Sequence, residues 1–210
     1  MPAPSTAARR RLLRARAEAG DAQAQFDLAC DYDFEPPKRK RLAIEWYLRA
    51  AEGGHVEAQN FLGEAYRNGD DVRKSRPRAV EWFRRAAAGG DSEAQLSLGY
   101  ALFYGEGVAR DRAAALRWYR RSARRGNAAA MANIALSYRL GQGVPRNLAH
   151  AVRWYLLAAA GGNARAEEWM LDVARPTRRV RSTARAILGR LVARTLTAAK
   201  SGDAAAQRTV

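Results

Sequence analysis

Apolar and small residues recur along the chain with the spacing of amphipathic helices. One stripe combines positions i, i+3, i+4, i+7 and i+8 of a single segment: Ala43, Trp46, Tyr47, Ala50 and Ala51. A second stripe follows at Ala58, Leu62 and Tyr66, which lie four residues apart. Each spacing places its apolar side chains on one face of a helix. The pattern therefore predicts two consecutive helices, here called helix B and the helix A that follows it.

The same pair of stripes returns several times. The segment AIEWYLRAAEGGHVEAQ at 43–59 recurs as AVEWFRRAAAGGDSEAQ at 79–95, ALRWYRRSARRGNAAAM at 115–131 and AVRWYLLAAAGGNARAE at 151–167. Two residues of the segment repeat every 36 positions, a tryptophan and a glycine: Trp46, Trp82, Trp118, Trp154, Gly54, Gly90, Gly126 and Gly162. A fixed period of this length is typical of an array of small supersecondary units that stack on one another.

Residues that start and end helices separate the stripes. Glycines follow each helix A, at Gly69, Gly105 and Gly141. Polar capping residues precede the next helix B, at Ser75, Asp111 and Asn147. A second polar set precedes each helix A, at Asp91, Asn127 and Asn163. These types suit left-handed C-terminal positions and N-caps. We therefore predict stacked helix-turn-helix hairpins, in which rings such as Trp118 fill the space between adjacent units.

Residues 98–130, LGYALFYGEGVARDRAAALRWYRRSARRGNAAA, resemble the Sel1-like repeat, with its L-G-x-x-Y-x-x-G-x-G-V turn and W-Y-x-x-A-A-x-x-G-[DN] segment. The resemblance covers about residues 20–174. It implies an all-α fold, an α/α superhelical solenoid akin to tetratricopeptide arrays, and an adaptor role. The first unit departs from the pattern, because it is two residues shorter and has DFEPPKRK in place of the turn.

The resemblance also sets the expected domain organisation. We expect a basic N-terminal segment or helix at 1–19, an array of about four units at 20–174, and a basic, degenerate C-terminal repeat or cap at 175–210. The segment LTAAKSGDAAAQ near the C-terminus fits a cap and equally the start of a further repeat.

Charge raises the question of partners. Lys and Arg number 37 against 21 Asp and Glu, which gives a formal charge of +16. Such an excess is compatible with acidic proteins, nucleic acid or anionic membranes as partners. The ends are the most basic parts, because five arginines precede Glu18 and no acidic residue lies between Val173 and Gly202. The alternative is that arginine merely fills solvated helix faces.

Candidate chemistry is sparse. His55 and His150 occupy different positions in their units, and His55 stands where other copies carry an Asp or Asn cap. Neither histidine has a spaced Cys or Glu partner, and the GEG and GQG turns lack the Lys-Ser/Thr of a phosphate-binding loop. We therefore predict no enzyme, no cofactor and no metal site.

The single cysteine and the hydropathy pattern bear on location. Cys30 excludes an intramolecular disulfide, which fits a reducing compartment, and its position in the middle of a helix indicates a buried or idle thiol. No stretch approaches the roughly 20 apolar residues that a membrane span needs. We expect a soluble, cytoplasmic protein.

By analogy with tetratricopeptide arrays, four positions of each helix A face the inner, concave curve: Asn60, Glu64, Arg67, Asn68, Leu96, Tyr100, Phe103, Tyr104, Ala132, Leu136, Arg139 and Leu140. The middle set is apolar and is expected to be partly exposed. We predict that the protein or peptide partner binds there, on eight of these residues: Asn60, Glu64, Arg67, Leu96, Tyr100, Phe103, Tyr104 and Leu136. Alternatively, Phe103 and Tyr104 pack on the next hairpin.

Basic residues at equivalent positions of helix B predict two rows on the convex side: Lys40, Arg76, Arg112, and Arg49, Arg85, Arg121. Such rows suit phosphate contacts without base reading, although solvated basic faces are common. The leading hypothesis is a non-catalytic adaptor that holds a peptide or partner protein in its concave face. The alternative is a basic protein that associates with nucleic acid through the arginine rows.

Overall fold

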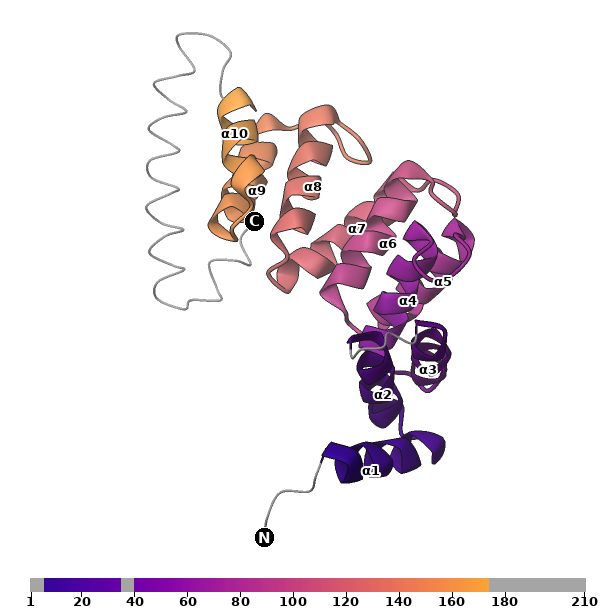
Figure 1. The fold of residues 1–210 in the computed structure, drawn as a ribbon. Helices are drawn as coiled ribbons and strands as arrows, with labels where there is room; N and C mark the ends of the chain where they lie inside the picture. Colours follow the sequence, from indigo (N-terminus) through magenta and orange to yellow (C-terminus); the bar gives the residue numbers. More distant parts are fainter. Residues whose placement is uncertain (1–5, 35–39, 174–210) are drawn as a thin grey trace, which may run out of the picture. The chain divides into compact units, whose positions relative to one another are not determined.

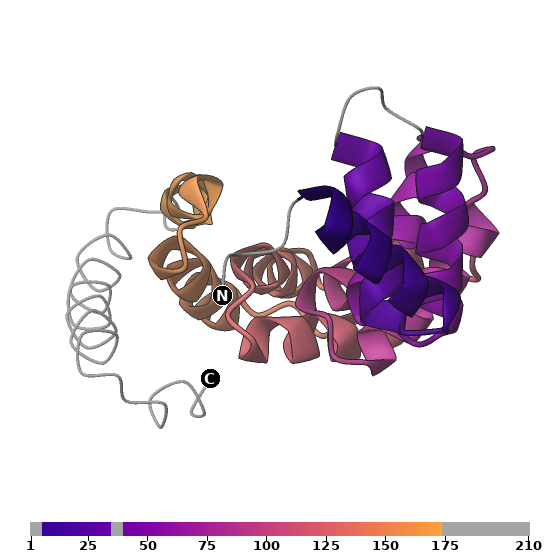
Figure 2. The ribbon, with the colours of Figure 1, turned by 60° about the horizontal axis from the view of Figure 1, so that its bottom comes forward.

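A computed structural model describes residues 6–34 and 40–173 and forms them into α-helices throughout (Figure 1 and Figure 2). In chain order the helices are α1 (Thr6–Glu18), α2 (Ala22–Phe34), α3 (Lys40–Glu52), α4 (Val56–Asn68), α5 (Arg76–Ala88), α6 (Ser92–Tyr104), α7 (Arg112–Arg124), α8 (Ala128–Leu140), α9 (Leu148–Ala160) and α10 (Ala164–Val173). The predicted all-α fold is confirmed. None of these helices is long and apolar enough to cross a membrane.

Within each compact unit, helices that follow one another in sequence pack side by side. Helix α2 packs on α3, α4 on α5, and α8 on α9. The chain divides between Arg110 and Asp111 into two compact units, so the predicted array at 20–174 spans both. The first unit contains α1 to α6 and the second contains α7 to α10. The predicted cap at 175–210 lies outside the described residues.

The predicted capping residues start and end the helices. The side chains of six polar residues each accept a hydrogen bond from the backbone N–H three residues ahead: Ser75, Asp91, Asp111, Asn127, Asn147 and Asn163. Gly69, Gly105 and Gly141 adopt left-handed conformations after α4, α6 and α8, with φ of 90°, 79° and 69°. Each cap satisfies backbone groups that a helix end leaves unpaired.

The rings that fill the core differ from the prediction in one respect. The residue after each of the four repeated tryptophans is the deeply buried one, at no more than 2% exposure: Tyr47, Phe83, Tyr119 and Tyr155. Trp46 is also buried, but Trp118 is only half-buried. Trp118 is therefore only partly enclosed, and Tyr119 is the ring of this helix that lies deepest in the core. Neighbouring residues of a helix differ by about 100° in direction, and here the second ring of the pair points into the core.

Buried glutamines connect successive hairpins. The Nε2 amides of Gln25, Gln59 and Gln95 donate to backbone carbonyl oxygens at the end of the preceding helix, at 3.0, 2.9 and 3.1 Å. These carbonyls belong to the last turn of a helix, where each also accepts a backbone N–H from the glycine that follows the helix, at 3.1–3.2 Å, so the glutamine provides a second hydrogen bond. The glutamine at this position thus joins α2, α4 and α6 to the helix before each of them.

The turn after α6 lies against the start of α5. A Cβ on Gly107 would lie 2.4 Å from the carbonyl carbon of Arg76 and 2.7 Å from the nitrogen of Pro77. Gly107 also has a φ of 72°, which favours glycine. The second glycine of the GEG turn therefore permits a backbone approach that a side chain would prevent.

Candidate partner-binding face

Helices α4 and α6 lie next to each other in the first unit and carry most of the predicted partner-binding residues. A hydrogen bond links them, because the hydroxyl of Ser97 donates to Oε1 of Glu64 at 3.1 Å. Glu64 also forms an ion pair with the guanidinium of Arg67, one turn along α4. We call the surface formed by Asn60, Glu64, Arg67, Leu96, Tyr100 and Tyr104 the α4–α6 face.

Two tyrosines dominate the exposed part of this face. Tyr100 is 41% exposed and Tyr104 is 52% exposed. Their ring centroids lie 4.5 Å apart with the planes tilted by 44°. The two residues are four positions apart on α6, which places them on adjacent turns of one face. Large aromatic side chains left open to solvent as a contacting pair form an apolar surface that a partner can cover.

Phe103 does not belong to this exposed surface. It is only 4% exposed, so the expectation of partial exposure is wrong. Its ring meets the ring of Tyr104 edge-on, with centroids 5.1 Å apart. The equivalent residues Arg67 and Arg139 are half-buried. Complete burial of a phenyl ring stabilises the fold, whereas a guanidinium keeps its charged end in water. The side chains at this helix position therefore differ in exposure from repeat to repeat.

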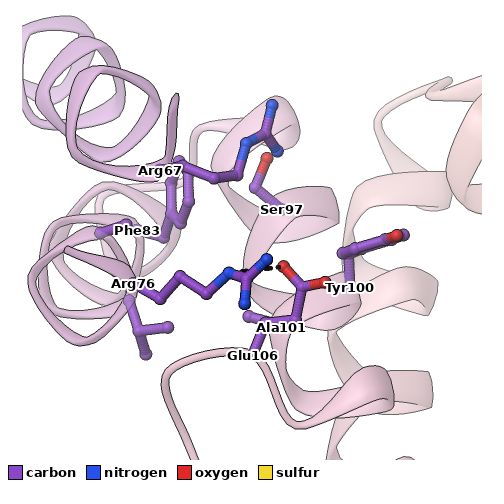
Figure 3. Close-up of a pocket in the computed structure, with 9 residues that line it drawn as sticks. Arg67, Arg76, Phe83, Ser97, Tyr100, Ala101 and Glu106 are labelled. Atoms are coloured by element: carbon purple, nitrogen blue, oxygen red, sulfur yellow. Dashed lines mark ion pairs between the residues drawn. The ribbon is translucent and has the colours of Figure 1, made fainter. Parts of the chain in front are cut away.

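A small pocket opens beside Tyr100, between α5 and α6 (Figure 3). Its volume is about 10 Å³, close to what one water-sized group requires. The guanidinium of Arg76 reaches Glu106 across it at 3.6 Å, while the ring of Tyr100 points away from this ion pair. Arg67 and Phe83 line the same pocket, with the Arg67 guanidinium 5.9 Å from the ring centroid. The pocket is too small to enclose an organic ligand.

The remaining predicted residues are less accessible. Asn60 and Leu96 are half-buried, and Oδ1 of Asn60 is buried without a hydrogen-bond donor among the described residues. Leu136 is half-buried on α8, in the second unit. It therefore belongs to a separate unit from the α4–α6 face.

The arginines of one predicted basic row rest on tryptophans of their own helices. The guanidinium carbons of Arg49, Arg85 and Arg121 lie 4.5, 4.6 and 4.6 Å from the ring centroids of Trp46, Trp82 and Trp118. The side chains are three residues apart, so each arginine covers the ring one turn away. All three arginines are exposed. Each arginine thus covers a tryptophan ring that is buried at position 46 and half-buried at positions 82 and 118.

The other predicted row is occupied by internal contacts. Lys40 Nζ lies 2.5 Å from Asp33 Oδ1 and 3.3 Å from Asp71 Oδ2, and the hydrogen bond with Asp33 raises the pKa of Lys40. Arg76 pairs with Glu106, and Arg112 is half-buried. The surroundings of Lys40 and Arg76 therefore do not support the phosphate-binding role predicted for them, because carboxylates already compensate both charges.

The residues considered for chemistry have structural surroundings. Nδ1 of His55 accepts the N–H of Ala58 at 3.3 Å, and its ring stacks on Phe26 at 4.3 Å, so His55 is a helix cap as predicted. Burial raises the pKa of the Cys30 thiol, whose sulfur lies 3.5 Å from the Tyr47 hydroxyl. Within residues 6–34 and 40–173, no group of three or more His, Cys, Asp or Glu residues is arranged to hold a metal ion.

Comparisons with solved structures place this architecture among known ones. A protective antigen of uropathogenic Escherichia coli strains, described as displaying an SLR fold, is 35% identical with a TM-score of 0.71 over 75% of this chain, which spans only 34% of the antigen's length. A Sel1 repeat protein from Oxalobacter formigenes is 32% identical with a TM-score of 0.70, over 78% of this chain and 71% of that one. An immunity protein from Pseudomonas aeruginosa, 21% identical with a TM-score of 0.51 over 91% of this chain and 76% of that one, shows the fold alone.

Family membership follows from the repeats themselves. No curated protein matches the chain. The model of the Sel1 repeat matches four times, at residues 22–55, 56–91, 92–127 and 128–163. Each match corresponds to one pair of helices, from α2 and α3 to α8 and α9. The matched residues make up more than half of the chain, and the similar structures are solenoids of the same repeat, so this protein belongs to the Sel1 repeat family.

Proposed function

We propose that this protein is a non-catalytic scaffold that binds a peptide segment of a partner protein across the α4–α6 face. Sel1 repeat proteins are generally protein-interaction scaffolds, and the family is typically non-catalytic. The observation that carries the proposal is the contacting pair Tyr100 and Tyr104, with 41% and 52% of their surfaces open to solvent.

Tyrosine is well suited to anchor a partner. It offers a large apolar surface with few rotatable bonds, and aromatic residues supply much of the energy at protein interfaces. Tyr104 rests against the buried ring of Phe103, so the pair has a rigid support. Binding therefore requires little ordering of the anchors themselves.

We expect the polar residues of the α4–α6 face to orient a bound peptide rather than to contribute much of its binding affinity. Glu64 is held between Ser97 and Arg67, so its oxygens already have partners. A ligand that replaced these contacts would gain little net energy, because it would break one set of polar interactions to form another. We therefore expect apolar contacts with the tyrosines to dominate, with Arg67 at the polar edge. The pocket beside Tyr100 accommodates one small group of an extended peptide rather than a whole small molecule.

The experiment is a selection of binding peptides followed by titration. The full chain is used to select peptides from a random display library, and each selected peptide is titrated into wild type and into Tyr100→Ala with Tyr104→Ala by calorimetry. The double variant should bind at least about 30-fold more weakly, which corresponds to roughly 2 kcal/mol.

The matched control is Leu42→Ala, which shortens an apolar side chain that is 37% exposed on α3 of the same unit. It should bind the selected peptides as wild type does. Equal affinity of the double tyrosine variant and wild type would place the binding surface elsewhere. Thermal unfolding of each variant verifies that the fold is retained.

A further inference from the structure

The positive charge of the chain is concentrated in the second unit. Residues 1–110 contain 18 basic and 16 acidic side chains, whereas residues 111–210 contain 19 basic and 5 acidic side chains. From Arg112 to Asn163 the sequence has nine arginines and no acidic residue. The two units therefore have different electrostatic characters although they are built from the same repeat.

A single repeat position shows where the difference arises. The residue before the tryptophan is Glu45 in α3 and Glu81 in α5, but Arg117 in α7 and Arg153 in α9. In the first unit, the arginine that covers the tryptophan lies four residues after this glutamate. Opposite charges at this spacing stabilise a helix. In α7 the same two positions hold Arg117 and Arg121, and like charges at this spacing repel each other.

Helix α7 presents these arginines as a row. Arg117, Arg121 and Arg124 lie at i, i+4 and i+7 and are all exposed. Arg121 is held over the ring of Trp118, with 4.6 Å from its guanidinium carbon to the ring centroid. We call these three residues the α7 arginine row. Its mutual repulsion is relieved when an anion binds along it.

The kind of anion follows from what surrounds the row. In the described part of the second unit, Leu140 is the only large hydrophobic residue that is exposed. Protein interfaces have an apolar core with few charges, whereas nucleic-acid interfaces are polar and strongly positive. We propose that the α7 arginine row binds the phosphate backbone of a nucleic acid, independently of the peptide site on the first unit.

The length of the α7 arginine row fits contacts with several phosphates, without recognition of the bases. Seven residues of helix extend over about 10 Å, which is the rise of about three phosphates along one strand of a duplex. A guanidinium can bind phosphate oxygens through two parallel N–H donors. The guanidinium of Arg121 lies over the ring of Trp118, which restricts its orientation. Arginines on a helix surface that contact only phosphates carry no sequence information.

The repeats supply a test that preserves the fold. Arg117→Glu with Arg124→Ala introduces the residues that α5 carries at the equivalent positions, Glu81 and Ala88. A control in the first unit, Arg49→Glu with Arg85→Ala, makes the same change in net charge. Fluorescence anisotropy measures binding of the full chain to labelled 30-nucleotide single-stranded and duplex oligonucleotides of mixed sequence over a range of KCl concentrations.

We expect wild type to bind both oligonucleotides with strong salt dependence. The α7 variant should bind at least tenfold more weakly, and its salt slope should be shallower by about two, whereas the first-unit control should stay within about threefold of wild type. The proposal would be overturned by the absence of a complex at low salt or by equal losses of affinity in both variants. Unchanged binding by the α7 variant would overturn it as well, because it would place the site among other basic residues. Binding to vesicles containing phosphatidylserine without binding to the oligonucleotides would also overturn it, in favour of a membrane surface.

Discussion

Nε2 of Gln95 donates a hydrogen bond to the carbonyl oxygen of Ala87 at 3.1 Å, from α6 back to the last turn of α5. Gln25 and Gln59 form the same contact in the two preceding repeats. The fourth repeat has Met131 at this position. Each glutamine adds a second hydrogen bond to a carbonyl that already accepts a backbone N–H at a packed helix end, so it links that helix end to the next hairpin.

Replacing this glutamine should destabilise the first unit. Gln95→Ala removes both the hydrogen bond and buried volume, and we expect a loss of about 2–3 kcal/mol in urea unfolding. Gln95→Met retains most of the volume and copies Met131, so it should lose only about 1 kcal/mol. If Gln95→Met were as stable as wild type, the amide group of Gln95, whose Oε1 is buried without a hydrogen-bond donor among the described residues, would contribute no net stability to the joint.

Two neighbouring rings of α7, Tyr119 and Trp118, differ in how deeply they are buried, so their substitution should destabilise the protein to different extents. Tyr119 is 1% exposed, whereas Trp118 is half-buried beneath Arg121. Tyr119→Ala should cost about 3–5 kcal/mol, because it leaves a cavity in the core, and Trp118→Ala should cost clearly less despite the larger side chain. Thermal unfolding of the two variants provides the comparison. The reverse order would show that the tryptophan is the principal core ring.

Gly107→Ala should be much more harmful than the same change at Gly54. Both glycines have positive φ, at 72° and 91°, but a Cβ at Gly54 meets nothing within 4 Å, whereas at Gly107 it meets the backbone of Arg76 at 2.4 Å. We expect Gly54→Ala to cost about 1–2 kcal/mol from the left-handed conformation alone. Gly107→Ala should cost at least about 1–3 kcal/mol more from the clash. Similar midpoints in urea would contradict the close approach of this turn to α5.

The Cys30 thiol should react slowly while the protein is folded. Burial raises its pKa, so less thiolate is present at a given pH than in an unfolded chain. At pH 8 the folded protein should react with a disulfide reagent such as Ellman's reagent at least about tenfold more slowly than the chain in urea. Cys30 is the only cysteine, so the signal has a single source. Equal rates would contradict its burial.

Much of the repeat architecture could be predicted from local chemistry. The caps Asp91, Asp111 and Asn147 act where the sequence placed them, since capping depends on a side chain and a nearby N–H of the same segment. The small residues of the stripes, such as Ala58 and Ala94, are fully buried. The 36-residue period repeats these local signals, so each unit supports the interpretation of the next.

Side-chain direction between helices was harder to predict. Tyr119 and Trp118 both lie on the apolar stripe, and only the packed structure shows which ring enters the core. Phe103 occupies a repeat position whose equivalents Arg67 and Arg139 are half-buried, but it is only 4% exposed, and its ring meets that of Tyr104 edge-on. The glutamine contacts depend on a carbonyl eight residues earlier, across a turn, and the recurrence of glutamine at 25, 59 and 95 does not identify that partner.

Contact between a partner protein and Tyr104 on the α4–α6 face can be measured by site-specific photo-crosslinking in the native cell. The photoreactive amino acid p-benzoyl-phenylalanine replaces Tyr104 in one strain and Leu42, on α3, in a control strain. After irradiation, we predict a discrete covalent adduct from position 104 that is absent from position 42 and is lost when Tyr100→Ala is added. An adduct from position 42 alone, or the same adducts from both positions, would contradict the assignment of the α4–α6 face as the binding surface.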